Sequence, residues 1–154
     1  MNQYSELLYY IKSLAESDEL VNTITKGDFE KVDLDKKNIF PLVHINITDG
    51  GFTNGSVVRF GVQIGAFDIR DINKELQTDK FFEQDNEVDN HNLTFAILNR
   101  MWLQMYVDFE KNNITASENP SLEIQTFTRG NLLDGWILTF EVEVPNTTIN
   151  LCDG

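Results

Sequence analysis

The stretch that decides the fold runs from Ile39 to Ile69 and reads IFPLVHINITDGGFTNGSVVRFGVQIGAFDI. Its first part, Ile39–Thr48, is rich in β-branched residues, and Pro41 stands near its start, where a strand tolerates a missing backbone N–H. Glycine and asparagine then crowd Asp49–Gly55, as they do in turns. Apolar and polar residues alternate through Ser56–Ile69. The stretch therefore predicts a long antiparallel hairpin that turns at Asp49–Gly55.

The alternation gives the second strand of this hairpin two different faces. One face is apolar and carries Val58, Phe60, Val62, Ile64 and Ala66. The other carries Arg59, Gly61, Gln63 and Gly65. Glycine inside a strand often marks the close approach of another backbone. Gly61 and Gly65 therefore indicate either a partner on this face or packing of the chain's own helix or arm against it.

Two amphipathic helices are predicted, one before and one after the hairpin in the sequence. Near the N-terminus, an apolar stripe recurs at helical spacing through Tyr4, Leu7, Leu8, Ile11, Leu14 and Ala15. The segment Leu93–Glu110 carries a second stripe that includes Ile97, Met101 and Met105. Long hairpins and two such helices predict an α+β fold, with a mostly antiparallel sheet and both helices packed on one face.

Three further strands are predicted, at Leu20–Thr25, Leu122–Thr128 and Trp136–Val144. The last is the most regular strand of the chain, yet only a polar tail at 145–154 follows it. An exposed edge strand favours aggregation, so we expect a neighbouring subunit or arm to cover this edge. The side chains expected to face the helices are Trp136, Leu138, Phe140, Val142 and Val144. Those expected to face outward are Ile137, Thr139, Glu141 and Glu143.

A length of 154 residues fits a single domain. One segment, 26–38, departs from the rest because it is densely charged and follows neither a strand nor a helix period. We interpret it as an extended arm or long loop that is held only at Phe29, Val32 and Leu34. An arm of this composition orders best on a neighbour, and the alternative is a flexible loop.

The chain is strongly acidic: 12 Lys and Arg face 25 Asp and Glu, for a formal net charge of -13. Such a surface repels nucleic-acid phosphates and anionic membranes, which argues against a DNA-binding module and a membrane partner. The densest run is Glu83, Asp85, Glu87 and Asp89. It lacks the central glycine and distal glutamate of an EF-hand loop, so we interpret it as an acidic loop and not as a metal site.

No catalytic constellation is visible in the sequence, so no enzyme activity and no cofactor are predicted. His44 lies within a predicted strand, where a packed or hydrogen-bonded histidine is expected, and His91 is expected to be solvated or to cap a helix. The single cysteine, Cys152, cannot form an internal disulfide and suits a reducing compartment. The N-terminus lacks the pattern of a signal peptide. Both tryptophans, Trp102 and Trp136, are expected to be largely buried.

Four motifs follow one another in an order that resembles a known group of proteins. They read TKGDFEKVDLDKKNIFPLVHINI, VVRFGVQIGAFDI, FAILNRMW and LLDGWILTFEVEVPN, the last followed by Cys152. In this order and spacing, across Ile24–Cys152, the chain resembles virion proteins of tailed bacteriophages that infect Bacteroidetes hosts. Within that group it is most similar to a tail terminator.

The resemblance implies a non-enzymatic structural protein that is made in the host cytoplasm and resides in the virion neck. Tail terminators are small α/β proteins that form a hexameric ring, cap the tail tube and present a docking surface to the head connector or stopper. DNA would pass through such a ring without specific binding. Alternatives are another neck protein (a head-completion, connector or tail-completion protein) or, from a different class, a small soluble ligand-binding or enzyme domain.

Candidate surfaces for this role follow from the features above. The residues proposed for subunit or partner contacts are Phe29, Val32, Leu34, Gly61, Gly65, Phe81, Phe82, Pro145 and Asn146. The acids proposed to face a DNA path are Glu83, Asp85, Glu87 and Asp89, because carboxylates deny phosphates the lysine and arginine clusters to which they adhere.

Overall fold

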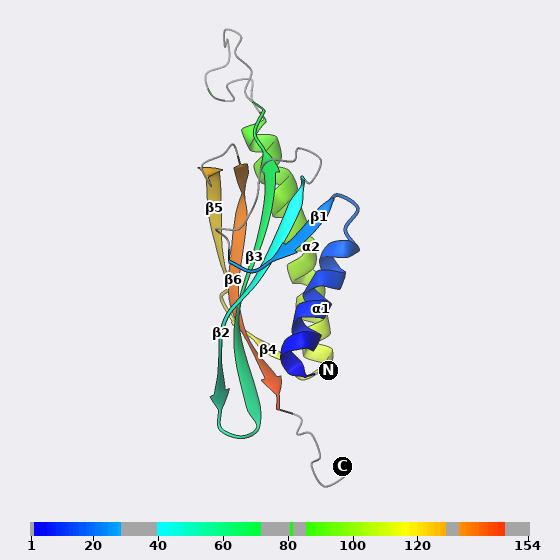
Figure 1. Ribbon diagram of the computed structural model, residues 1–154, viewed down its shortest axis with the longest axis vertical. Helices are drawn as coiled ribbons and strands as arrows, with labels where there is room; N and C mark the ends of the chain where they lie inside the picture. The colour runs from blue at the N-terminus through cyan, green and yellow to red at the C-terminus, as the bar shows by residue number, and fades with distance from the viewer. Residues whose placement is uncertain (1, 29–39, 72–80, 82–85, 129–132, 147–154) are drawn as a thin grey trace.

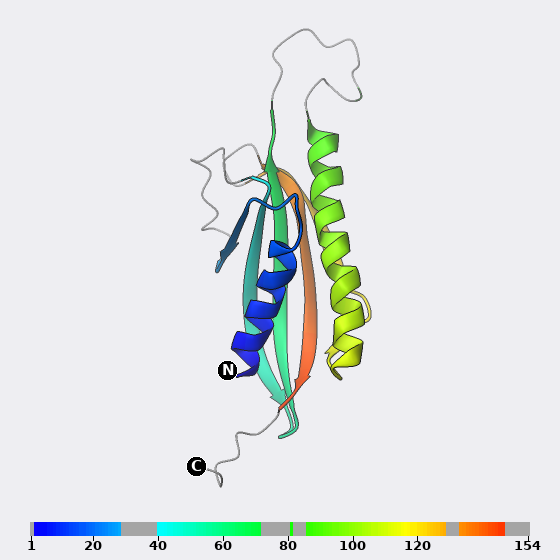
Figure 2. The ribbon, with the colours of Figure 1, turned by 90° about the vertical axis from the view of Figure 1, so that its right-hand side faces the viewer.

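Two layers make up the computed structural model: a six-stranded sheet and a pair of helices (Figure 1). The structure describes residues 2–28, 40–71, 81, 86–128 and 133–146. Both helices lie on the same face of the sheet, in front of it in Figure 2. The predicted α+β fold, with a mostly antiparallel sheet and two helices on one face, is confirmed.

The elements follow one another as α1 (Gln3–Glu16), β1 (Thr23–Lys26), β2 (Leu42–Thr53), β3 (Val57–Ile69), α2 (Glu87–Lys111), β4 (Thr115–Ala116), β5 (Ser121–Thr128) and β6 (Leu133–Pro145). Across the sheet the order is β1-β2-β3-β6, and β4 and β5 both pair with β6. Only β1 and β2 are parallel; every other described pair is antiparallel. The strands predicted to begin at Leu20 and Trp136 begin at Thr23 and Leu133.

The last strand, β6, is not an edge, and the expectation that it would be one was wrong. It pairs with β3 from Leu133 to Pro145, and β5 and β4 pair with it on the opposite side. One strand that shields it, β5, comes earlier in the chain, and β6 pairs with it as its antiparallel neighbour. Among the described strands, the sheet instead ends in β1 on one side and in β4 and β5, which both pair with β6, on the other.

The β2–β3 hairpin is confirmed, but its turn is shorter than predicted. Asp49–Gly51 belong to β2, where a register shift between Ile47 and Asp49 marks a bulge. The chain reverses at Asn54, which has a φ of 57° and accepts a hydrogen bond from the Ser56 N–H at 2.9 Å. Asparagine tolerates this backbone conformation better than most residues. The glycines at 50 and 51 therefore serve a bulged strand and not the turn.

The main core lies between the sheet and the helices. It contains the predicted inward positions of β3 and β6, from Val62 to Ala66 and from Leu138 to Val142 on alternate residues, and the stripes of both helices. A smaller cluster lies on the opposite face of the sheet and consists of Phe40, Leu42, Phe67, Leu133 and Ile137. Ile137 was expected to face outward; it does lie on that face, but this cluster buries it.

Helix α2 begins at Glu87, six residues before the predicted start at Leu93. Glu87 and Asp89 therefore belong to its first turn and not to an acidic loop, which corrects that interpretation. Carboxylates in the first turn of a helix are stabilised by the helix dipole, so the acidic run itself favours this longer helix. Helix α1 is capped by Asn2, whose Oδ1 accepts the Ser5 N–H at 3.1 Å.

Candidate functional site

A buried polar cluster lies where β3 ends and where α2 and β6 begin. The Asp134 side chain is completely buried and accepts two hydrogen bonds from Arg70, Nε to Oδ2 at 2.9 Å and Nη2 to Oδ1 at 2.7 Å. The Glu87 carboxylate lies 3.2 Å from the same Nη2 atom. A buried charge of this kind is tolerated only when it is paired and hydrogen-bonded, as it is here.

Two asparagines extend this cluster to the backbone. Asn86 Nδ2 and Asn90 Nδ2 donate to the Ile69 carbonyl at 3.2 and 2.9 Å, and Asn90 Nδ2 also lies 3.3 Å from Asp134 Oδ2. The Asp71 N–H donates to Asn86 Oδ1 at 2.6 Å. The cluster therefore ties the chain just before residue 72 to the chain just after residue 85. These hydrogen bonds and ion pairs make the cluster a structural clamp.

Asp68 lies beside this clamp, because it is the β3 residue that pairs with Asp134. Burial raises the pKa of its carboxyl, and the negative charge of Asp134 raises the pKa further. The hydrogen bond that Asp68 accepts from the Ile69 N–H at 2.8 Å acts in the opposite direction and lowers the pKa. The charged form of Asp68 is thus disfavoured in the folded protein.

His44 forms a second anchor, on the sheet face opposite the helices. It is buried, with Nδ1 2.6 Å from Thr25 Oγ1 and Nε2 2.7 and 3.1 Å from the Gly27 and Asp28 carbonyls. Carbonyl oxygens only accept hydrogen bonds, so Nε2 carries a proton, and in the neutral ring Nδ1 accepts from the threonine hydroxyl. His44 is therefore a hydrogen-bonded histidine, as the sequence predicted, and it holds the chain leaving β1.

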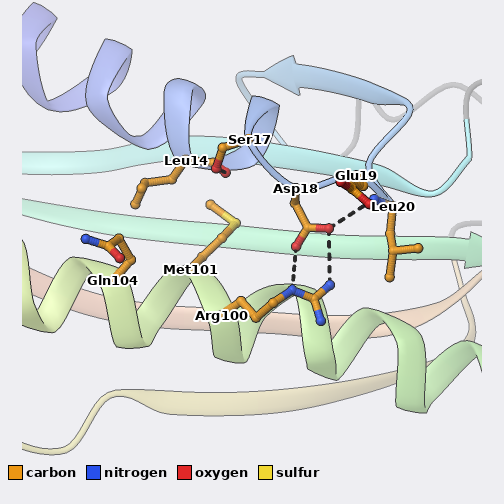
Figure 3. A pocket seen from close by; sticks show the side chains of 8 residues that line it. All are labelled: Leu14, Ser17, Asp18, Glu19, Leu20, Arg100, Met101 and Gln104. Carbon is orange, nitrogen blue, oxygen red and sulfur yellow. Dashed lines mark hydrogen bonds and ion pairs between the residues drawn. The ribbon is translucent and has the colours of Figure 1, made fainter.

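A cavity of about 560 Å³ lies between the end of α1 and the middle of α2 (Figure 3). An ion pair spans it: Arg100 Nε and Nη2 donate to the Asp18 carboxylate at 2.8 and 3.1 Å. The Leu20 N–H also donates to Asp18, at 3.0 Å. The Arg100–Asp18 ion pair therefore holds the turn after α1 against α2.

A smaller cavity of about 320 Å³ opens between α1, α2 and the end of β6. The Tyr10 hydroxyl donates to Asp108 Oδ2 there at 2.6 Å. Burial, the hydrogen bond to Asp108 and the charge of Asp108 all raise the pKa of Tyr10 well above its usual range. Tyr10 therefore remains a neutral donor, which suits a link between two helices and not a base.

His91 and Trp136 join α2 to the β5–β6 side of the sheet. The Trp136 indole N–H donates to the His91 carbonyl at 3.1 Å, and His91 Nε2 lies 2.9 Å from the Gln125 carbonyl. Phe95 packs edge-on against the indole. His91 was expected to be solvated or to cap a helix, but it bridges two elements instead. Trp136 and Trp102 are both partly buried, less than expected, because each lies at the border of the core.

The predicted contact residues are spread over different parts of the molecule. Phe29, Val32, Leu34 and Phe82 lie outside the described residues. Phe81 is exposed. Pro145 ends β6, and Asn146 is held by the chain itself, since it accepts from Gln3 at 3.2 Å and its N–H donates to the Ser56 carbonyl at 2.8 Å.

Gly61 and Gly65 are both buried in β3. At Gly61 a Cβ atom would collide with the Asp49 carboxylate and would lie 2.6 Å from Thr48 Oγ1. The bulge in β2 thus occupies the space beside this glycine; it belongs to a neighbouring strand, and neither the partner nor the helix or arm considered from the sequence is seen there.

Of the predicted lumen acids, the structure describes Glu87 and Asp89. Glu83 and Asp85 lie outside the described residues, Glu87 faces Arg70, and Asp89 is exposed on α2. Within the described part of the chain, no group of three or more His, Cys, Asp or Glu side chains is placed to hold a metal ion.

Sequence reasoning did not single out the clamp residues Arg70, Asn86, Asn90 and Asp134. They appear in the sequence as ordinary polar residues near predicted segment ends, and only the tertiary pairing reveals their role. A weak signal existed at Asp134, which immediately precedes a glycine at the start of an apolar strand.

Comparison with known proteins adds no relative: no protein-family model matches the chain, and no curated protein matches it in sequence. Among the described residues, neither helix is long and apolar enough to cross a membrane.

Proposed function

We propose that this protein is a non-enzymatic virion component that forms a ring at the phage neck, of the tail terminator type. The ring would cap the tail tube and present a surface to the head connector. The proposal draws on the sequence resemblance described above, and one structural observation carries it further. Both helices cover the same face of the sheet, with the main apolar core beneath them. The opposite face, the open face, is covered by no described helix and carries the smaller apolar cluster.

The open face supports a position next to DNA. Its strand residues include the carboxylates of Asp49, Glu123, Glu141 and Glu143, against the guanidinium of Arg59. Arg59 is itself neutralised, with Nη1 3.2 Å from Glu141 and 3.8 Å from Asp49. A lumen lined by this face would release DNA readily, because phosphates adhere to proteins mainly through unpaired basic groups.

The β2–β3 hairpin supports an axial contact with the tail tube or the connector. It extends past the ends of both helices in Figures 1 and 2. Phe52, close to its tip, is 78% exposed. Exposed aromatic side chains on projecting elements are typical anchors of protein interfaces. The proposal therefore places Phe52 in the contact between this ring and its axial partner.

A tube-capping assay tests the function. Tail tube protein is polymerised with and without this chain, and tube length and joining to heads are scored by electron microscopy. The proposal predicts that the chain stops elongation and permits joining. Phe52→Ser should abolish capping without unfolding the chain, whereas Tyr106→Ser, at a comparably exposed aromatic on α2, should leave capping intact. Elongation that continues in the presence of the wild-type chain contradicts the proposal and favours another neck component.

A further inference from the structure

The two edge strands of the described sheet, β1 and β5, match each other. We propose that β1 of one copy pairs with β5 of the next, antiparallel, so that a continuous sheet runs around the ring. This inference rests on the ring-forming function proposed above and names the contact that closes the ring. Four independent features of the two edges support it.

The first feature is their level in the sheet. The strand registers align residues from one edge to the other in a row that reads Ile24, Val43, Ala66, Trp136 and Ile124. The next row of the same face runs from Lys26 at the β1 edge to Leu122 at the β5 edge. The two edges therefore stand at the same height, and copies placed side by side bring them together without an axial shift.

The second feature is strand direction. Strand β1 is parallel to β2, β2 and β6 are each antiparallel to β3, and β5 is antiparallel to β6. It follows that β1 and β5 run in opposite directions. When copies repeat around an axis, β1 and the neighbour's β5 meet as an antiparallel pair, which is the more stable of the two strand arrangements.

The third feature is the direction of the backbone hydrogen-bonding groups. The N–H groups of Thr23 in β1 and of Gly27 just after it donate toward β2, to the carbonyls of Pro41 and Ile45. Successive residues of a strand point these groups to opposite sides, so Ile24 and Lys26 direct theirs away from the sheet.

The same alternation can be followed to the other edge. Just after β6, the Asn146 N–H donates toward β3, whereas the Glu141 carbonyl in β6 accepts a hydrogen bond on the β4 side. The backbone N–H and C=O groups of odd-numbered β6 residues therefore point toward β4 and β5. Glu123 pairs with odd-numbered Ile137, so its backbone N–H and C=O groups point toward β6. The backbone groups of Leu122 and Ile124 therefore point outward, away from the sheet. A hydrogen bond from Gln125 Nε2 to the Ile124 carbonyl at 3.3 Å agrees with this direction.

The fourth feature is the side-chain face. Ile24 packs against the core on the helix side, and Ile124 is in register with Trp136, which packs on the same side. Residues that face each other in an antiparallel pair place their side chains on one face. Pairing Ile24 with Ile124 and Lys26 with Leu122 therefore keeps the helices of every copy on the same side. If the outward backbone groups of β5 belonged to residues whose side chains face away from the helices, neighbouring copies would place their helices on opposite sides of the sheet. A ring of equivalent copies could then not form.

The β5 edge has little of the usual protection against pairing. Charged residues, lysine above all, and proline protect exposed edge strands, and Ser121–Thr128, SLEIQTFT, has one charge, Glu123, and neither lysine nor proline. Leu122 and Ile124 are 42% and 50% exposed in the single chain. A neighbouring β1 covers both, with Ile24 and the aliphatic stem of Lys26 beside them. A strand from a different virion protein is the other possible occupant, and the experiment separates the two.

Disulfide crosslinking tests the predicted register. In a Cys152→Ser background, Lys26→Cys and Leu122→Cys are introduced together. Residues facing each other in a hydrogen-bonded antiparallel pair have Cα atoms about 5.5 Å apart, within disulfide range. Mild oxidation should give a ladder of linked oligomers up to the closed ring, which a reductant collapses to the single chain. Mixing the two single variants should stop at the dimer.

The matched control is Lys26→Cys with Glu123→Cys, because Glu123 is the next residue of β5 but lies on the opposite face. It should give no ladder. Absence of a ladder in the Lys26→Cys/Leu122→Cys protein overturns the edge pairing, even if the chain caps tail tubes. Crosslinks from position 122 to the tail tube protein alone also overturn it. A ladder from a chain that does not cap tubes sustains the edge pairing and rejects the proposed function.

Discussion

Asp134 and Arg70 form a two-point ion pair in which the carboxylate is fully buried, and the pair joins the start of β6 to the chain just beyond β3. Removing one partner of a buried pair leaves an uncompensated charge and typically costs about 3–5 kcal/mol. Asp134→Asn should therefore lower the free energy of unfolding by about 3 kcal/mol or more, measured by urea denaturation. Glu141→Gln, at an exposed ion pair with Arg59, should change it by less than about 1 kcal/mol.

Gly135 is required by the close approach of β3 and β6. A Cβ atom at this position would collide with the Ala66 carbonyl, which is backbone and cannot swing aside. Gly135→Ala should lower the free energy of unfolding by about 1–3 kcal/mol or more, as overpacked cores do. The control is Gly55→Ala in the hairpin turn, where an added Cβ meets no atom within 4 Å. Equal effects of the two substitutions would contradict the close approach.

Trp136 links α2 to the sheet through its ring contacts and its indole N–H. Truncation of large buried aromatics costs about 3–5 kcal/mol, and partial burial places Trp136→Ala near the lower limit, at about 3 kcal/mol. Tyr106→Ala, on the exposed side of α2, should change the free energy of unfolding by less than about 0.5 kcal/mol. A similarly small change at Trp136 would place the indole outside the core.

Asp68 should make stability depend on pH in a defined direction. Its pKa is raised in the folded state, so its contribution to stability is fully present below the ordinary aspartate pKa of about 3.9 and is lost as the pH rises through the folded pKa. Asp68→Asn removes this penalty and keeps an oxygen for the Ile69 N–H. The variant should be more stable than wild type at neutral pH, with the difference vanishing in acid. A difference that grows in acid would refute the assignment.

Salt should strengthen self-association. Each chain carries a formal charge of -13, so copies repel one another, whereas the proposed edge contact is made by backbone groups and apolar side chains. Raising the ionic strength from about 0.01 M to 1 M shortens the Debye length from about 30 Å to 3 Å and screens this repulsion. Light scattering should show a larger mass at high salt. Dissociation at high salt would indicate an interface held by ion pairs.

The sequence was most informative where one local rule governed the outcome. Strict alternation placed Val62, Ile64 and Ala66 on the helix side of β3, and helical spacing identified both helices. Prediction from the sequence failed where contacts between distant parts of the chain decide the local structure. The glycines at 50 and 51 resemble a turn, yet a bulge opposite Gly61 keeps them in β2.

The strand order was also beyond local reasoning. Nothing in the alternation of Trp136–Val144 distinguishes an edge from a strand that β3 and β5 flank on both sides. Likewise, Arg70 and Asp134 are 64 residues apart in the chain, and no short-range pattern relates a charged residue to a partner at that separation.

The most direct measurement of the central claim is a cryo-electron microscopy reconstruction of the virion that contains this chain. The account predicts six copies in one closed ring between the end of the tail tube and the head connector, with the helices of all copies on one side of a continuous sheet. Copies scattered elsewhere in the particle, or a chain absent from the purified virion, would contradict it.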